Sequence, residues 1–137
     1  NPGASKAVVA IAFSIENPVG VEGRANEHRT EAGLDGLFMR NPFLAAGDPL
    51  WGSFALCVAG AGDGKVSWLR GWHGSRWRVG PLLFWDDFSS DGELGPEEAV
   101  RDSVGSLCLK REIAPRQSAD YTFLVAWHFP NRPRSRP

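Results

Sequence analysis

The stretch that decides the fold is ADYTFLVAWHFPN, at residues 119–131. Its side chains form two alternating sets: Tyr121, Phe123, Val125, Trp127 and Phe129 in one, and Thr122, Leu124, Ala126 and His128 in the other. Period-two alternation with aromatic and β-branched residues predicts a β-strand. Because even the second set is mostly apolar, the pattern predicts a central strand that is covered on both faces. Pro130 lacks an amide donor, so the strand should end before it.

Several upstream stretches carry a strand pattern as well. They are residues 7–16 (AVVAIAFSIE), 36–40 (GLFMR), 52–59 (GSFALCVA), 65–70 (KVSWLR) and 103–112 (SVGSLCLKRE). The connection GAGDG, at residues 60–64, predicts that KVSWLR is the return strand of a hairpin with GSFALCVA. Residues 24–35 are polar and lack a useful periodicity, so they are expected to form a loop.

Length and composition indicate one folded domain. The chain has 137 residues, of which 42% are hydrophobic and 23% are charged. Its formal net charge of −1 gives no electrostatic reason to expect nucleic acid or an acidic membrane as a partner. The 16 Gly, 10 Pro and 6 Trp indicate many turns and large apolar side chains. We therefore predict an all-β fold, an antiparallel two-sheet β-sandwich with a long aromatic-rich loop.

Two further features concern the cell compartment. Cys57 and Cys108 each lie in an apolar strand pattern, which favours buried thiols that act as small hydrophobic side chains; a bridge between them is left open. The sequence shows neither a signal-peptide pattern at its start nor an apolar run of roughly 20 residues that could cross a membrane as a helix. No transmembrane segment is therefore expected, and a cytoplasmic location is predicted.

The irregular part of the chain is residues 71–102. It contains Trp72, Trp77, Trp85 and Phe88, and within it residues 82–88 could form one or two helical turns. A loop of this length inside a compact domain is usually functional or an interface. We expect its aromatic side chains to pack on the domain or on a neighbour.

Known catalytic and metal-binding patterns are missing from the sequence. His28, His73 and His128 are far apart and none has a second ligand at zinc-site spacing, so no metal and no cofactor are predicted. The glycines at 60–64 lack the Ser or Thr and the helix of a phosphate loop. Two carboxylate pairs, at 86–87 and 97–98, are interpreted as solvated charges, because a glycosidase needs its carboxyl groups on either side of one bond. No catalytic residue is predicted.

One cluster is compatible with carbohydrate binding. Aromatic and hydrogen-bonding side chains gather within eight positions: Arg70, Trp72, His73, Arg76 and Trp77. Flat indole rings can stack on sugar rings, but buried tryptophans also dominate interfaces between domains. The speculative substrate-binding set is therefore Arg70, Trp72, His73, Trp77 and His128, where His128 is equally well explained as a hydrogen-bonded strand residue.

A series of short segments, taken in order, resembles a known family. They are the opening strand followed by ENPVG, the segment GLFM, the W-x-x-F-x-x-x-G-x-L pattern at 85–94, the strand GSLCL at 105–109 and the ending FLVAWHFPNR. Together they resemble the N-terminal β-sandwich domain of the non-lysosomal glucosylceramidase, or bile-acid β-glucosidase, family, glycoside hydrolase family 116. The resemblance runs from about residue 7 to residue 132, and AWHFPN is its most specific piece.

The resemblance implies a function for the parent protein. Members of this family are retaining β-glucosidases that act on glucosylceramide and other β-glucosides, and their catalytic carboxylates lie in a following helical (α/α)6 domain. Residues 1–130 are thus expected to be the later portion of an accessory β-sandwich, and residues 131–137 a basic Pro-rich linker towards that catalytic domain. The expected partners are the catalytic domain of the same polypeptide and, through the parent enzyme, a β-glucoside or glucosylceramide. The alternative is a free-standing carbohydrate-binding module that uses exposed tryptophans.

Overall fold

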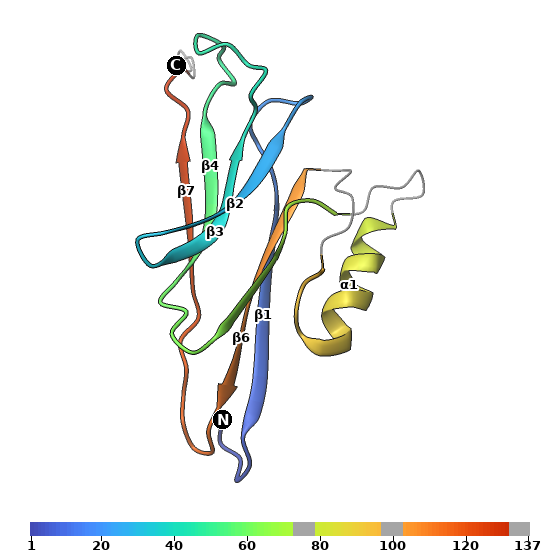
Figure 1. Cartoon of the computed structure of the whole chain (residues 1–137), viewed down its shortest axis with the longest axis vertical. Coiled ribbons are helices and arrows are strands. Elements are labelled where there is room, and N and C mark those ends of the chain that lie inside the picture. Colours follow the sequence, from blue (N-terminus) through green and yellow to red (C-terminus); the bar gives the residue numbers. More distant parts are fainter. Residues whose placement is uncertain (73–78, 97–102, 132–137) are drawn as a thin grey trace, which may run out of the picture.

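The computed structural model describes residues 1–72, 79–96 and 103–131. Two antiparallel sheets pack face to face (Figure 1). The three-stranded sheet has the order β1 (Ala7–Glu16), β6 (Val104–Ile113), β5 (Lys65–Leu69), and the four-stranded sheet has the order β2 (Ala25–Glu31), β3 (Leu34–Arg40), β4 (Ser53–Ala59), β7 (Thr122–His128). The predicted antiparallel two-sheet β-sandwich is confirmed.

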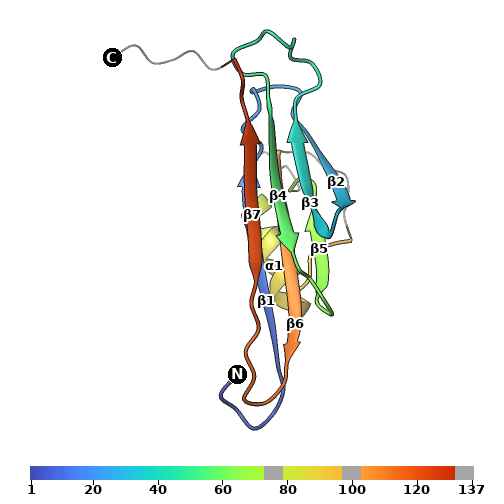
Figure 2. The same cartoon turned by 90° about the vertical axis from the view of Figure 1, so that its left-hand side faces the viewer.

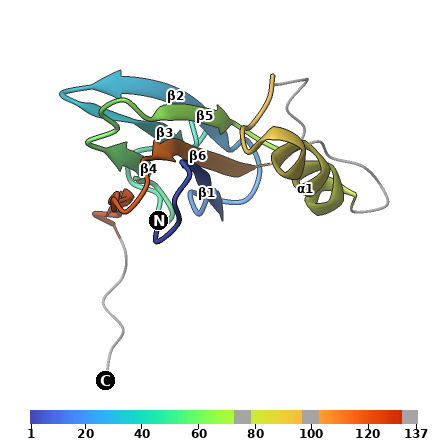
Figure 3. The ribbon, with the colours of Figure 1, turned by 90° about the horizontal axis from the view of Figure 1, so that it is seen from below.

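The core lies between the two sheets and follows the alternation of the strands. From the four-stranded sheet, Leu37, Met39 and Leu56 are fully buried. Leu107 and Leu109 face them from β6 and are also fully buried. Because side chains at positions i and i+2 of a strand share a face, the intervening residues of β6 point to the outer side of the three-stranded sheet. The α-helix α1 (Gly80–Asp91) lies on that outer side, beside the sandwich (Figure 3).

Three strands match their predicted positions closely. β1 spans the predicted residues, while β4 and β6 each begin one residue later than expected and β6 also ends one residue later. Both cysteines are free thiols: Cys108 is fully buried and Cys57 is half-buried. The strand predicted at 36–40 is the later part of β3.

The predicted loop at 24–35 is wrong. Residues Ala25–Glu31 form β2, which pairs with β3 along its whole length, from Ala25 opposite Arg40 to Glu31 opposite Leu34. None of the side chains of β2 is fully buried, so hydrophobic periodicity could not reveal the strand. Its cross-strand contacts are polar instead: Arg40 donates a hydrogen bond to Glu27, and His28 contacts Asp35.

The predicted hairpin between GSFALCVA and KVSWLR is also wrong. β4 pairs with β3 and β7, whereas β5 pairs with β6 in the opposite sheet. The turn after β4 therefore carries the chain from one sheet to the other. The strand prediction was correct, but a tight connection does not determine which strand is the partner.

The final strand is shorter and less buried than predicted. β7 pairs only with β4 among the described residues and forms an edge of the four-stranded sheet (Figure 2). Phe123 packs against the core, but the Trp127 side chain is 70% exposed. The prediction of a central strand covered on both faces is therefore wrong. Apolar side chains on both faces indicated burial by some neighbour, and the described residues do not provide it.

Candidate interaction surface

α1 is a full helix of 12 residues, longer than the one or two turns predicted for 82–88. Pro81 lies in its first turn, where a missing amide hydrogen costs nothing. The helix ends at Gly92, which has φ 75° and donates its amide hydrogen to the Phe88 carbonyl oxygen at 2.8 Å. Glycine suits this left-handed C-terminal position because it has no Cβ to clash. The Gly92 of the W-x-x-F-x-x-x-G-x-L pattern is thus a helix terminator.

One side of α1 packs on the domain through stacked aromatic rings. The ring centroids of Trp72 and Phe84 are 5.2 Å apart, and those of Phe84 and Phe88 are 6.0 Å apart. The Trp72 indole nitrogen donates a hydrogen bond to the hydroxyl oxygen of the fully buried Ser106 at 2.8 Å. At the other end of the helix, Lys110 donates to the Asp91 carbonyl oxygen at 2.7 Å. These contacts fix α1 on the outer face of the three-stranded sheet.

The opposite side of α1 exposes large apolar side chains. Leu82 and Trp85 are 59% and 58% exposed, and Leu83 beside them is also exposed. We call these three residues the helix surface. Positions 82 and 85 are three residues apart and therefore lie on the same face of a helix. Leu83 lies about 100° round the helix from Leu82, so it extends the exposed apolar surface beyond that face. Large apolar side chains exposed on a rigid element favour an interaction site. The helix surface is the first candidate for contact with a partner.

A second apolar region lies where β1 and β7 form edges of the two sheets. Ile11 and Phe13 share a face of β1 with Ile15, which packs against the core, yet both are exposed. Val125 and Trp127 share a face of β7 with the core residue Phe123, and both are exposed too. The Phe13 and Phe123 rings stack with centroids 6.2 Å apart. We call this region, defined by Ile11, Phe13, Val125 and Trp127, the open side.

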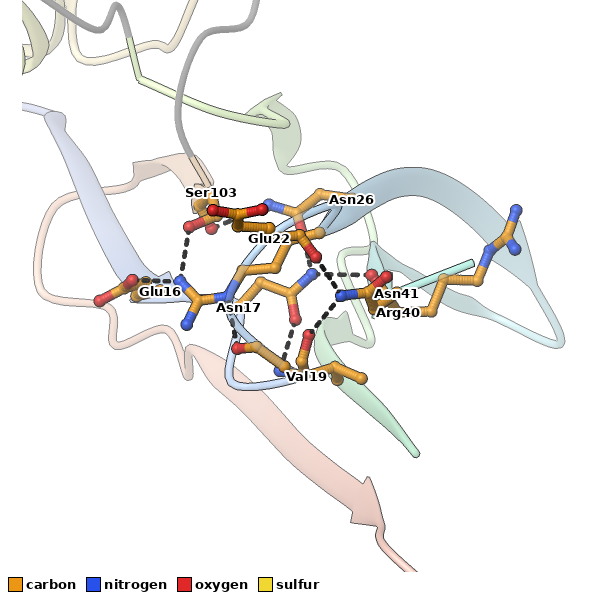
Figure 4. Close-up of polar contacts among 10 residues, drawn as sticks. Glu16, Asn17, Val19, Glu22, Asn26, Arg40, Asn41 and Ser103 are labelled. Carbon is orange, nitrogen blue, oxygen red and sulfur yellow. Dashed lines mark hydrogen bonds and ion pairs between the residues drawn. The ribbon is translucent and has the colours of Figure 1, made fainter. Parts of the chain in front are cut away.

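A polar network closes one end of the sandwich (Figure 4). Asn17 is fully buried; its amide nitrogen donates to the carbonyl oxygens of Ala25 and Arg40, and its side-chain oxygen accepts from the Val19 amide. Its backbone amide donates to the Ser103 carbonyl oxygen, 2.9 Å away, where it continues the pairing of β1 with β6 in the three-stranded sheet. Asn17 therefore joins backbone groups of β2, of β3 and of the segment before β6. These contacts serve the structure.

Of the predicted sugar-binding residues, the structure describes Arg70, Trp72 and His128, and His128 lies in the opposite sheet from the strand that leads to the other two. Trp72 is held against Phe84 and Ser106, and Arg70 is exposed just after β5. His128 lies at the end of β7 in the opposite sheet, with its ring centroid 6.4 Å from that of Trp51. His73 and Trp77 lie outside the described residues. The substrate-binding set stays a prediction.

Two acidic side chains near α1, Glu93 and Asp87, are held by contacts within the fold. Glu93 accepts hydrogen bonds from Lys65 and Lys110, and these two ammonium groups lower the pKa of its carboxyl group. Asp87, on α1, accepts a hydrogen bond from the Gly95 amide at 2.9 Å. Residues 97 and 98, the other predicted carboxylate pair, are outside the described ranges. Within those ranges, no three His, Cys, Asp or Glu side chains gather as metal ligands would.

None of the helices in the described part of the chain combines the length and the apolar character needed to cross a bilayer.

Comparison with known proteins gives one result that covers nearly the whole chain. A family model described as beta-glucosidase 2, glycosyl-hydrolase family 116 N-term, matches residues 1–136. No curated protein matches the chain.

Proposed function

Since the chain belongs to the family of N-terminal domains of glycosyl-hydrolase family 116, we propose that it is a non-catalytic accessory domain of a β-glucosidase. In this proposal it packs on a helical (α/α)6 catalytic domain of the same polypeptide and holds that domain in its active shape. The substrate of the parent enzyme would be a β-glucoside, with glucosylceramide as the lipid-linked candidate. The domain itself would supply no catalytic carboxylate.

The observation that carries this proposal is the helix surface. Leu82, Leu83 and Trp85 are exposed on a helix that is itself fixed by Trp72 and by its glycine terminator. An exposed tryptophan on a rigid support is a common anchor of interfaces, because it buries a large area at a small cost in side-chain entropy. A helical catalytic domain would offer matching grooves between its own helices. The helix surface is therefore the expected contact.

The test is the double variant Leu82→Ser/Trp85→Ser, made both in the chain alone and in the full-length protein. In the chain alone, the free energy of unfolding should change little, because both side chains are exposed. In the full-length protein, the variant should lower the melting temperature and the rate of hydrolysis of an aryl β-glucoside. The difference between the two contexts measures the contact between the domains.

The matched control is Val21→Ser. Val21 is even more exposed, at 75%, but it lies in the loop after β1, away from α1. It should leave both contexts unchanged. If the double variant behaves like Val21→Ser in the full-length protein, the helix surface is not the contact. Turnover of an aryl β-glucoside by the chain alone, lost after a single substitution within it, would show that the domain is catalytic.

A further inference from the structure

The sandwich has two long sides on which edge strands of both sheets come together, and in the described part of the chain they differ. On one side, β2 and β5 meet through the rings of His28 and Trp68, whose centroids are 4.3 Å apart. On the other side, β1 and β7 form the edges of the open side (Figure 2). Phe13 and Phe123 stack there, but Trp127 is left 70% exposed on the face that Phe123 turns to the core. The described residues thus leave the interior of the sandwich partly uncovered along this side.

The two sides also differ in how their edge strands are protected. Free edges of natural sheets usually carry charged side chains or proline, or are very short, which prevents pairing with another chain. β2 has three charged side chains among its seven residues, and β5 is only five residues long. Residues 7–15 of β1 and 122–127 of β7 contain no charged residue, no proline and no glycine. The open side therefore has the features of an edge that pairs with another strand.

The hydrogen bonds of β1 indicate which of its backbone groups face the open side. The Asn17 amide donates to the Ser103 carbonyl oxygen, and these two residues continue the register in which β1 pairs with β6. Hydrogen-bonded and non-hydrogen-bonded positions alternate in an antiparallel pair, so the odd-numbered residues of β1 bond to β6. The even-numbered residues from 8 to 14 direct their N–H and C=O groups to the free edge instead. β1 thus offers a row of backbone groups to a further strand.

A second copy of the chain fits this side, because the side is complementary to itself. In a contact with twofold symmetry the same patch is used by both copies, so charged groups in it would face like charges. The four residues that define the open side are all uncharged. If two β1 strands pair antiparallel about Ala12, Ile11 of one copy lies opposite Phe13 of the other, on the inner face of the sheet. The apolar interior then continues from one copy into the next.

We propose that the chain forms a twofold dimer through its open side. β1 pairs with β1 of the second copy, so that the two three-stranded sheets become one, and Val125 and Trp127 pack across the same axis. α1 lies on the outer face of this sheet and takes no part, so the dimer does not depend on the contact proposed for the helix surface. The exposed fractions describe the single chain, and the effects on unfolding expected for exposed residues apply where dilution has separated the two copies.

The experiment is sedimentation equilibrium of the chain from nanomolar to high micromolar concentration. The mass should rise from that of one copy to that of two copies and then stay constant, because a twofold contact is closed. A mass of one copy over the whole range would overturn the proposal. A mass that keeps rising beyond two copies would contradict it as well, since it would show open-ended pairing of strand edges.

The first variant is Trp127→Lys, which places a charge inside the proposed contact. Because the Trp127 side chain is 70% exposed in the single chain, the variant should keep its circular dichroism spectrum. The dissociation constant of the dimer should rise about tenfold or more, because like charges that face each other in a contact are unfavourable. Phe43→Lys, with the same change at an 84% exposed position in the loop after β3, is the matched control and should dimerise normally. Equal dissociation constants for the two variants would show that the open side is not the contact.

The second variant, Ala12→Pro, tests the pairing of the backbone. Ala12 directs its amide to the free edge, so proline there removes no hydrogen bond from the single chain. The variant should remain folded and should lose the dimer; an unchanged dissociation constant would mean that β1 is not the pairing strand. The double variant Leu82→Ser/Trp85→Ser should dimerise as the unmodified chain does, so the test of the helix surface and the test of the dimer can fail separately.

Discussion

At the scale of single residues, the segments that carry the family resemblance serve to build the fold. Asn17 of ENPVG ties together backbone groups of several segments. Gly36 of GLFM lies so close to β4 that a Cβ there would be 2.3 Å from the Leu56 carbonyl oxygen. Asn131, at the end of AWHFPN, donates hydrogen bonds to the carbonyl oxygens of Ala46 and Asp48. These roles explain the residues without any reference to catalysis.

Asn17→Ala should be among the costly polar substitutions in this chain. It would leave the Val19 amide and the carbonyl oxygens of Ala25 and Arg40 without their buried partner. We expect a loss of about 2–3 kcal/mol in the free energy of unfolding, measured with urea. Ser89→Ala, on the exposed side of α1, is the control and should cost very little. Equal costs for the two variants would mean that the network does not hold the end of the sandwich.

Cys108 should make the stability of the chain depend on alkaline pH. Burial raises the pKa of its thiol from 9.0 to about 11, against the opposing effect of a hydrogen bond with Ser67. Folding thus favours the protonated thiol, whereas the unfolded chain begins to release the proton near pH 9. This contribution to stability is complete below that pH and is lost as the pH rises towards the folded value.

The measurement is the free energy of unfolding at a series of alkaline pH values, for the unmodified chain and for Cys108→Ala. The fall in stability above pH 9 should be less steep in the variant, although Cys57 and Tyr121, whose pKa values are also raised by burial, contribute to both curves. Parallel curves would indicate that the thiol ionises equally well in the folded chain.

At the scale of elements, the sequence predicted the strands that carry an apolar alternation and missed the polar strand β2. The alternation in β1 and β4 placed both strands within one residue. β2 escaped prediction because its contacts are polar cross-strand pairs, such as Glu27 with Arg40. The strands that pair with β5 and β7 could not be predicted either. The alternation of polar and apolar side chains indicates a strand, but it does not indicate which other strand forms hydrogen bonds with it. The candidate interaction surface could be predicted only in part. The aromatic residues of 71–102 were expected to pack on the domain or on a neighbour, but the sequence did not indicate which side chains of α1 would face outwards.

Because β7 lies at the edge of its sheet, a substitution in it should change the free energy of unfolding less than one in a central strand. Had Trp127 been buried, Trp127→Ala would have cost about 3–5 kcal/mol. With the ring 70% exposed, we expect a loss of less than about 1 kcal/mol in urea unfolding of the chain. Leu107→Ala, at a fully buried position of β6, should instead cost about 2–5 kcal/mol. A larger loss for Trp127→Ala than for Leu107→Ala would place the core on the open side.

At the scale of the whole molecule, exposed apolar side chains gather in two separate regions, the helix surface and the open side. The helix surface lies on α1, outside the three-stranded sheet, and the open side lies at the edges formed by β1 and β7. A polar pocket lies at the end formed by the β4–β5 turn and the β6–β7 connection. The proposed role as an accessory domain depends on the helix surface.

The most direct test of that role is the accessibility of the Trp85 side chain, measured by hydroxyl-radical footprinting and mass spectrometry. In the chain alone, Trp85 is 58% exposed and should be oxidised readily. In the full-length protein, its oxidation rate should fall several-fold, while that of Phe43, which is 84% exposed on a loop, serves as the internal reference. An unchanged rate at Trp85, relative to Phe43, would contradict the proposed packing of α1 against a catalytic domain.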